Sequence, residues 1–288
     1  MMTHVPRFVS VFLLAGIGLF ALGCGGGEST DGSASSSEAT PPNTLTAAEE
    51  AEGWTLLFDG EDLSAWTGLG RDSIPEGHWQ IEDGILRKVQ SEEVPRAADG
   101  QPLEGGDIMT KETYRNFELK LEWRASEAGN SGIKYNVSDS LSVAHEPAHA
   151  ALGFEYQLLD DERHPDNQEP SHRAAALYDL IAPGAQKALN PVGEWNEARV
   201  VFDGPRGEHW LNGEKVLEYD LTSARFDSLF EASKYADIEG FRTRRAGHIV
   251  LQDHTTDFWF RNIKIRELPA NEATANEATA DGATASVE

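Results

Sequence analysis

A short segment near the middle of the 288-residue chain, "GFEYQLLDD" from Gly153 to Asp161, carries a carboxylate and an amide that could act together. The segment alternates as a β-strand does, and side chains two residues apart in a strand point to the same face. Glu155 and Gln157 would therefore share one face, and Phe154 and Tyr156 the other. A carboxylate can take a proton and an amide can bind a hydroxyl group, so this face could do acid–base or binding chemistry.

Two more predicted strands place polar side chains on one face. Their two polar faces are Asn130, Gly132, Lys134 and Asn136 in "NSGIKYNVS", and His248, Val250, Gln252 and His254 in "HIVLQDH". The opposite faces carry Ser131, Ile133, Tyr135 and Val137, and Ile249, Leu251 and Asp253. Alternation alone also fits an ordinary solvent-facing side. The enrichment in Asn, Gln and His favours instead a groove whose polar groups converge on sugar hydroxyls.

Other known chemistries fit these residues poorly. Laminarinase-like jelly-roll enzymes carry their carboxylates in a Glu-x-Asp-x-x-Glu pattern on one strand, whereas this chain has Gln157 at the Asp position, and Asp160 falls on the opposite face unless a bulge intervenes. The segment "HEPAH" matches the spacing of a zinc-protease motif, but Pro147 would break the required helix. A single carboxylate among amides and imidazoles is better suited to proton abstraction.

The elements that would position these residues are mostly strands. Asp83-Gly84 and Asn212-Gly213 each stand between apolar runs and predict β-hairpins. Residues 114–126 alternate as a half-buried antiparallel strand, and residues 224–236 alone suit a helix. Many strands, abundant turns and one short helix predict an all-β sandwich or jelly roll of two antiparallel sheets.

The two ends of the chain differ in composition from the centre. Residues 1–24 have the build of a secretion signal, and "ALGC" resembles a lipobox that would place a lipid on Cys24, the only cysteine. We expect a flexible linker at 25–52, one domain at 53–268 and a disordered tail at 269–288. These features predict an exported, lipid-anchored protein of the cell envelope. The net charge of −25 disfavours nucleic acid as a partner.

Several short motifs follow one another in a consistent order between Gly53 and Leu268. They include "GWTLLFDGEDLSAW", "NFELKLEWR", "GNSGIKY", "FEYQLLDD", "GHIVLQDH" and "FRNIKI". This ordered set resembles the 3-keto-disaccharide hydrolase family, which implies a concanavalin A-like jelly roll. The chain departs from the family pattern at Trp54, where Phe is usual, and at Ala175, where Gly is expected. Residues 138–152 look like an insertion at the rim of the groove.

The resemblance implies cleavage of a sugar that is already a ketone at C3. Such a site needs a base near C2, a cation or donor at O3, and an acid for the leaving oxygen. On this basis Glu155 is the expected base or a metal ligand, His254 the competing base, Lys134 the oxyanion partner and His172 the acid or a metal ligand.

The remaining expected roles concern binding. Asn130, Gln157, Gln252 and Arg261 would bind the substrate, although an Arg on a final strand often forms a structural ion pair. Glu155, Asp160 and His172 are candidate ligands of a divalent metal ion, with Asp160 able instead to cap a turn. The alternative function is a noncatalytic, lectin-like carbohydrate-binding module on the same fold.

Overall fold

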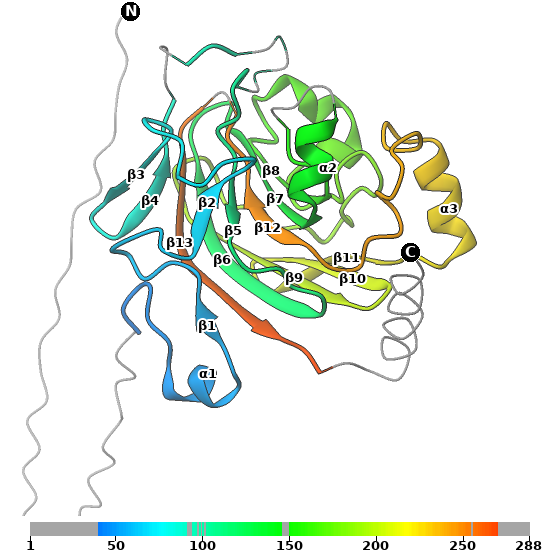
Figure 1. Ribbon diagram of the computed structural model, residues 1–288. Coiled ribbons are helices and arrows are strands. Elements are labelled where there is room, and N and C mark those ends of the chain that lie inside the picture. Colours follow the sequence, from blue (N-terminus) through cyan, green and yellow to red (C-terminus); the bar gives the residue numbers. More distant parts are fainter. Residues whose placement is uncertain are drawn as a thin grey trace, which may run out of the picture. The chain divides into compact units, whose positions relative to one another are not determined.

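Two antiparallel β-sheets face each other in the computed structural model, which describes residues 40–90, 94–96, 98, 100, 102–145, 150–254 and 256–269 (Figure 1). The larger, 8-stranded sheet has the order β11-β10-β9-β6-β13-β4-β3, with β1 also paired to β13. The 5-stranded sheet has the order β2-β5-β12-β7-β8. This arrangement confirms the predicted jelly-roll sandwich.

Each segment that was predicted to alternate contains a strand, namely β6, β7, β8 and β12. The larger sheet contains β1 (Thr55–Leu56), β3 (Trp79–Glu82), β4 (Ile85–Lys88), β6 (Phe117–Ala125), β9 (Asn196–Asp203), β10 (Arg206–Leu211), β11 (Glu214–Asp220) and β13 (Phe258–Glu267). The smaller sheet contains β2 (Trp66–Gly68), β5 (Ile108–Thr110), β7 (Asn130–Val137), β8 (Phe154–Leu159) and β12 (His248–Leu251).

Both predicted hairpin turns are present. Asp83 and Gly84, between β3 and β4, have φ values of 51° and 73°, and Asn212 and Gly213, between β10 and β11, have 50° and 84°. Two successive residues with positive φ match the twist of the flanking strands, which is why these dipeptides favour hairpins.

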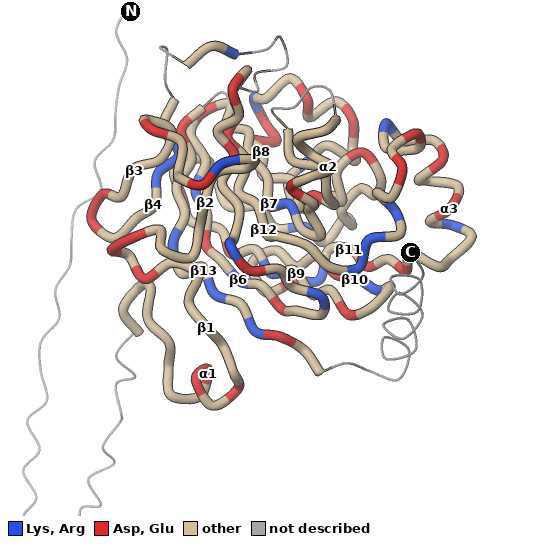
Figure 2. The backbone as a smooth tube through the Cα atoms, in the orientation of Figure 1, with Lys and Arg blue, Asp and Glu red and all other residues tan. Residues whose placement is uncertain are grey.

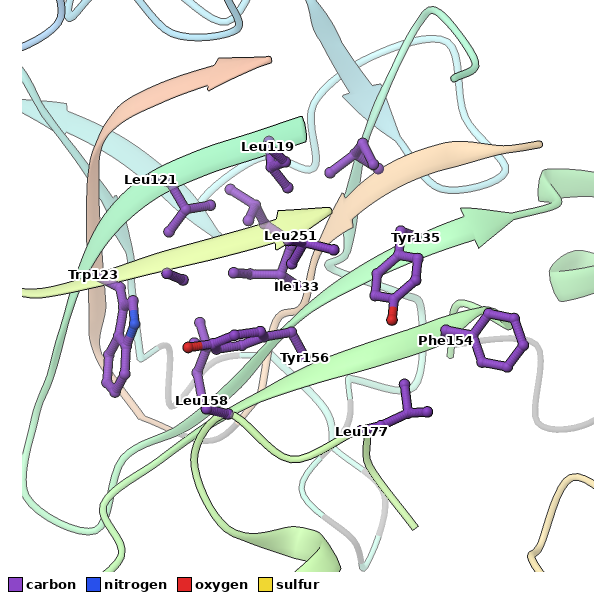
Figure 3. Close-up of a cluster of buried hydrophobic side chains, with 14 of the residues drawn as sticks. Leu119, Leu121, Trp123, Ile133, Tyr135, Phe154, Tyr156, Leu158, Leu177 and Leu251 are labelled. Atoms are coloured by element: carbon purple, nitrogen blue, oxygen red, sulfur yellow. The ribbon is translucent and has the colours of Figure 1, made fainter. Parts of the chain in front are cut away.

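The hydrophobic core lies between the two sheets. Side chains from β6, β7, β8 and β12 point toward one another in Figure 3, among them Ile133, Tyr135 and Tyr156. These three are 0% exposed. The inward faces of β7 and β8 are thus fixed by apolar packing, and their outward faces must carry Lys134 and Glu155.

One residue of β7 does not follow simple alternation. Asn136 has a φ of 54°, and the pairing of β7 with β12 shifts register beside it. This bulge turns Val137 away from Ile133 and Tyr135, so that it packs with Val250 on the other side of the sheet. The prediction that Val137 shares the inward face was therefore wrong.

The helices are short. They are α1 (Ala47–Ala51), α2 (Asp139–Ala144), α3 (Ala224–Glu231) and the 3-10 turns η1 (Pro165–Gln168) and η2 (Pro170–His172). Helix α3 confirms the predicted helix, and it buries Phe226 and Phe230. None of the helices in the described ranges is long and apolar enough to cross a membrane. Acidic residues occur on strands, turns and helices alike (Figure 2).

Ordered structure begins before Gly53, within the segment expected to be a linker. Asn43 is only 6% exposed, and it exchanges hydrogen bonds with Asn262 of β13. Thr46 and Glu49 form a reciprocal capping box at the start of α1. The signal segment and Cys24 lie outside the described residues, as does the tail from residue 270.

Candidate active site

A cavity of about 840 Å³ lies on the outward face of the smaller sheet. Its floor is made by side chains of β7, β8 and the segment directly after β12, namely Asn130, Lys134, Glu155, Gln157, Gln252 and His254. Its walls come from loops and include Arg96, His145, Leu152, His164, Asp166, Tyr178, Lys234 and Tyr235.

Strand pairing sets which floor residues lie beside each other on neighbouring strands. Lys134 is paired directly with Glu155, and their Nζ and Oε2 atoms are 3.8 Å apart. Gly132 is paired with Gln157 on one side, and on the other its carbonyl accepts a hydrogen bond from Gln252 N–H. The Glu155 side chain lies across Gly132, since a Cβ atom there would stand 2.2 Å from Oε1.

The polar side chains of the floor are buried, whereas polar side chains on an ordinary solvent-facing side of a sheet are exposed. His254 is the most exposed of the six at 9%, and Gln157 is 1% exposed. The Oε1 atoms of Gln157 and Gln252 are buried without a hydrogen-bond partner among the described residues. Buried polar atoms are nearly always bonded, so these two amides are suited to meeting the polar groups of a ligand.

A second carboxylate lies behind Lys134. Asp107, which is 0% exposed, accepts hydrogen bonds from the backbone N–H groups of Asp253 and Ala151 at 2.8 and 3.3 Å. Burial raises the pKa of Asp107 to about 6, although the positive charge of Lys134 opposes that rise. Lys134 therefore sits in the field of two carboxylates, Glu155 in the cavity and Asp107 behind it.

The segment that carries His254 is anchored by a buried charge cluster. Asp253 is 0% exposed and contacts His78, Lys88 at 3.1 Å and Arg96 at 3.3 Å. Desolvation would raise the pKa of Asp253, but these three partners hold it below its ordinary value. Lys88 also donates to the His254 carbonyl, and burial lowers the Lys88 pKa to about 8. A lysine of the larger sheet thus holds the His254 segment of the cavity floor in place by a hydrogen bond.

Tyr178 and Lys234 form one wall. The Lys234 ammonium lies 4.3 Å from the centre of the Tyr178 ring and 5.2 Å from that of Tyr235. The residue as a whole is exposed, yet desolvation of its ammonium beside these rings lowers the Lys234 pKa. The Tyr178 hydroxyl donates to Asp166 at 3.2 Å.

Comparison with known proteins identifies the family. The profile of the 3-keto-alpha-glucoside-1,2-lyase-like domain matches residues 53–266. A 3-keto-disaccharide hydrolase from Bacteroides thetaiotaomicron is 34% identical over 250 residues, which cover 80% of this chain and 84% of that protein. The chain belongs to the 3-keto-disaccharide hydrolase family.

Solved structures agree with this membership. A Parabacteroides distasonis protein provisionally named a glycosyl hydrolase is 30% identical, with a TM-score of 0.69 over 80% of this chain and 100% of that chain. A second protein of the same description from that organism is 28% identical, with a TM-score of 0.55 over 75% of this chain and 99% of that one. The chain is thus an enzyme of the 3-keto-disaccharide hydrolase family.

In this family member the structure brings six of the predicted site residues together: Asn130, Lys134, Glu155, Gln157, Gln252 and His254. It places the other three elsewhere. Arg261 lies on β13 of the larger sheet, where it pairs with Glu122 at 2.7 Å and covers the Trp195 ring. Arg261 therefore forms a structural ion pair, which was the alternative expected for it, and it does not line the cavity.

Asp160 and His172 also serve the fold. The Asp160 carboxylate accepts hydrogen bonds from the backbone N–H groups of Ala128 and Glu162 at 2.8 and 3.1 Å, and it thereby caps a turn. Both ring nitrogens of His172 face carboxylates, Asp166 at 3.0 Å and Asp179 at 3.2 Å.

The predicted metal ligands Glu155, Asp160 and His172 are consequently not assembled. The described part of the chain contains no group of three or more His, Cys, Asp or Glu side chains placed to hold a metal ion.

Sequence reasoning missed the loop and second-sheet residues of the site. His164 and Lys234 stand in loops without alternation, and only the folded chain brings them to the cavity. Asp107 and Lys88 do not line the cavity but contact the residues next to it: Asp107 accepts from the Asp253 and Ala151 N–H groups, and Lys88 donates to the His254 carbonyl. Ala175, at the position where Gly was expected, has a φ of 67°, a conformation that favours glycine.

Proposed function

We propose that the enzyme cleaves 3-keto-glycosides by elimination followed by hydration. A base removes the C2 proton, which the C3 ketone acidifies, and the electron pair forms an enolate at O3. The enolate then expels the glycosidic oxygen from C1, and that oxygen receives a proton. Water adds across the new C1–C2 double bond, with hydroxide at C1 and a proton at C2, so that the net reaction is hydrolysis.

The observation that carries this proposal is the Lys134–Glu155 pair. C2 and C3 are neighbouring atoms, so a base for the C2 proton and a cation for O3 must lie close together. The Lys134 Nζ and Glu155 Oε2 atoms are 3.8 Å apart on the floor of the cavity. In a buried site a fixed ammonium stabilises a developing oxyanion far more than it would in water.

The other groups suit the remaining steps. Asn130, Gln157 and Gln252 offer amide groups for sugar hydroxyls, and His254 could protonate the leaving oxygen. The only other carboxylate among the described lining residues, Asp166, is already bonded to His172 and Tyr178. This arrangement supports proton abstraction by one carboxylate over a pair of glycosidase carboxylates. His254 remains the competing base.

The test replaces Glu155 by Gln in the purified chain and follows cleavage of the 3-ketone of a glucose disaccharide. Loss of the base should lower kcat by about 10²- to 10⁴-fold while sugar binding persists. Glu122→Gln on the larger sheet is the matched control and should retain activity. A chain that binds the sugar but never turns over any glycoside would support the lectin-like alternative. Full activity of Glu155→Gln would show that Glu155 is not the base and would favour His254 in that role.

We further propose that the protein is exported and anchored by a lipid on Cys24. The support is the apolar run of residues 9–22 followed by "GC". Cells fed a radiolabelled fatty acid should label the wild-type chain, and Cys24→Ser should be unlabelled and leave the membrane fraction. Membrane retention of unlabelled Cys24→Ser would contradict the anchor.

A further inference from the structure

Three polar side chains form a line from a loop to the floor of the cavity. His164 Nε2 lies 3.5 Å from Asn130 Nδ2, and Asn130 Oδ1 lies 3.1 Å from Gln157 Nε2. At the cavity end of this line, Gln157 Oε1 is buried without a partner. The line connects two amides that a substrate would meet to a histidine whose other ring nitrogen, Nδ1, is bonded to the backbone.

The first link fixes the histidine tautomer. The backbone N–H of Asp166 donates to His164 Nδ1 at 3.2 Å, as part of the cap of η1. A backbone N–H can only donate, so Nδ1 must carry the lone pair, and a neutral imidazole then carries its hydrogen on Nε2.

The surroundings of His164 keep the ring neutral. Burial lowers the pKa of His164, although the carboxylates of Asp160 and Asp166 oppose this. The other titratable ring beside it is that of His254, at 6.3 Å between centroids. A protonated ring would also place an N–H on Nδ1 against the Asp166 N–H, so the hydrogen bond itself favours the neutral form.

The tautomer determines the amide that follows. His164 Nε2–H needs an acceptor, and an amide nitrogen cannot be one. Half a turn of the Asn130 amide exchanges its oxygen and nitrogen, which brings Oδ1 to His164 and turns Nδ2–H toward Gln157. Half a turn of Gln157 then lets its Oε1 accept from Asn130. His164 Nε2–H and Asn130 Nδ2–H then each meet an acceptor, the buried Gln157 oxygen gains its missing partner, and Gln157 Nε2–H faces the cavity.

We infer that His164 is a positioning residue that sets the polarity of the cavity floor: through Asn130 it obliges Gln157 to present N–H rather than C=O to the substrate. The inference rests on the proposed function for the identity of the ligand, an acceptor oxygen of the keto sugar. The hydrogen-bond polarity itself is independent of that function.

The direct test is NMR of the full chain labelled with ¹⁵N and ¹³C and free of substrate. We expect the neutral His164 ring with hydrogen on Nε2, and a scalar coupling across the hydrogen bond from Asn130 Nδ2 to the Gln157 side-chain carbonyl. Hydrogen on Nδ1, or a coupling from Gln157 Nε2 to the Asn130 carbonyl, would overturn the inference. Because no substrate is present, failure of the proposed function leaves these signals unchanged.

Asn130→Asp provides a second test. Its carboxylate can accept from His164 Nε2–H but cannot donate, so Gln157 must turn its N–H to Asp and its C=O to the cavity. We expect an unchanged His164 tautomer. We also expect KM for the 3-ketone of a glucose disaccharide to rise about two- to tenfold, the worth of one hydrogen bond, with a smaller change in kcat. A shift of the ring hydrogen from Nδ1 to Nε2 in the variant would mean the opposite polarity in the wild type.

Discussion

Adding one methyl group at Gly132, by the substitution Gly132→Ala, should lower activity in a chain that still folds. A Cβ atom at Gly132 would stand 2.2 Å from Oε1 of Glu155, 2.9 Å from Cδ and 3.1 Å from Cγ, whereas ordinary contact begins at 3.4 Å. The carboxylate must therefore move by about 1 Å, and a misplacement of that size costs about 10²-fold in rate, or ~2.7 kcal/mol of transition-state stabilisation. Gly132 has no positive φ, so the backbone accepts alanine.

The assay compares kcat and thermal unfolding of Gly132→Ala with those of Gly207→Ala. Gly207, on the larger sheet, is equally crowded, since its Cβ would stand 2.1 Å from the Tyr219 ring. Both variants should lose about 1–3 kcal/mol of stability from overpacking, but only Gly132→Ala should lose activity.

A double-mutant cycle with Glu155→Gln should be strongly non-additive, because both changes act through one carboxylate. Wild-type kcat in Gly132→Ala, or a loss that simply adds to that of Glu155→Gln, would refute this account of the site.

Three further outcomes concern stability. Lys88→Met should lower the free energy of unfolding by about 3–5 kcal/mol in a urea titration, because it leaves Asp253 as a buried charge with one partner fewer. The control Lys120→Met removes a half-buried ion pair with Glu118 at 3.9 Å and should cost under ~1 kcal/mol. Equal losses in the two variants would contradict the stabilising role of the buried cluster. Burial lowers the pKa of His209 to about 3, so below pH 6.5 the unfolded chain binds the extra proton and stability falls by up to ~1.4 kcal/mol per pH unit. His209→Gln should remove this contribution, and a wild-type-to-variant difference that is the same at pH 4.5 and 7 would refute it. Ala175→Gly should raise the free energy of unfolding by up to about 1 kcal/mol by relieving the φ of 67°; the control Ala176→Gly should lower it, and a melting temperature that falls equally in both would argue against strain at Ala175.

The fold was predictable wherever local patterns decide it. Asp83-Gly84 and Asn212-Gly213 favour hairpins by themselves, and apolar residues such as Ile133 and Tyr135 at period 2 fix which face of a strand is inward. The cavity floor followed from the same rule, because whatever alternates with the core side chains must point outward. The outward position of Glu155, Gln157 and Lys134 was therefore predictable without knowledge of the fold.

The remainder of the site depends on contacts between distant segments. Nothing in the local sequence indicates that Lys88 of β4 contacts the His254 carbonyl or that Lys234, after α3, lines the cavity. The bulge at Asn136 was hidden because a positive φ in a non-glycine residue leaves no periodic signal. Asp160 and His172 were misplaced for a related reason: carboxylates and imidazoles also cap turns and join loops, and sequence spacing does not distinguish that use from catalysis.

The hydrogen bond from Lys88 to the His254 carbonyl joins the two sheets at the floor of the cavity. Many enzymes lose activity on heating before they unfold, because their sites lie on the least stable segments. Here Lys88 of β4 binds both the His254 carbonyl and Asp253, so loosening the floor requires breaking buried contacts between the two sheets. Catalysis and tryptophan burial should therefore disappear at the same temperature, and the melting temperature should be a direct measure of the upper limit of activity.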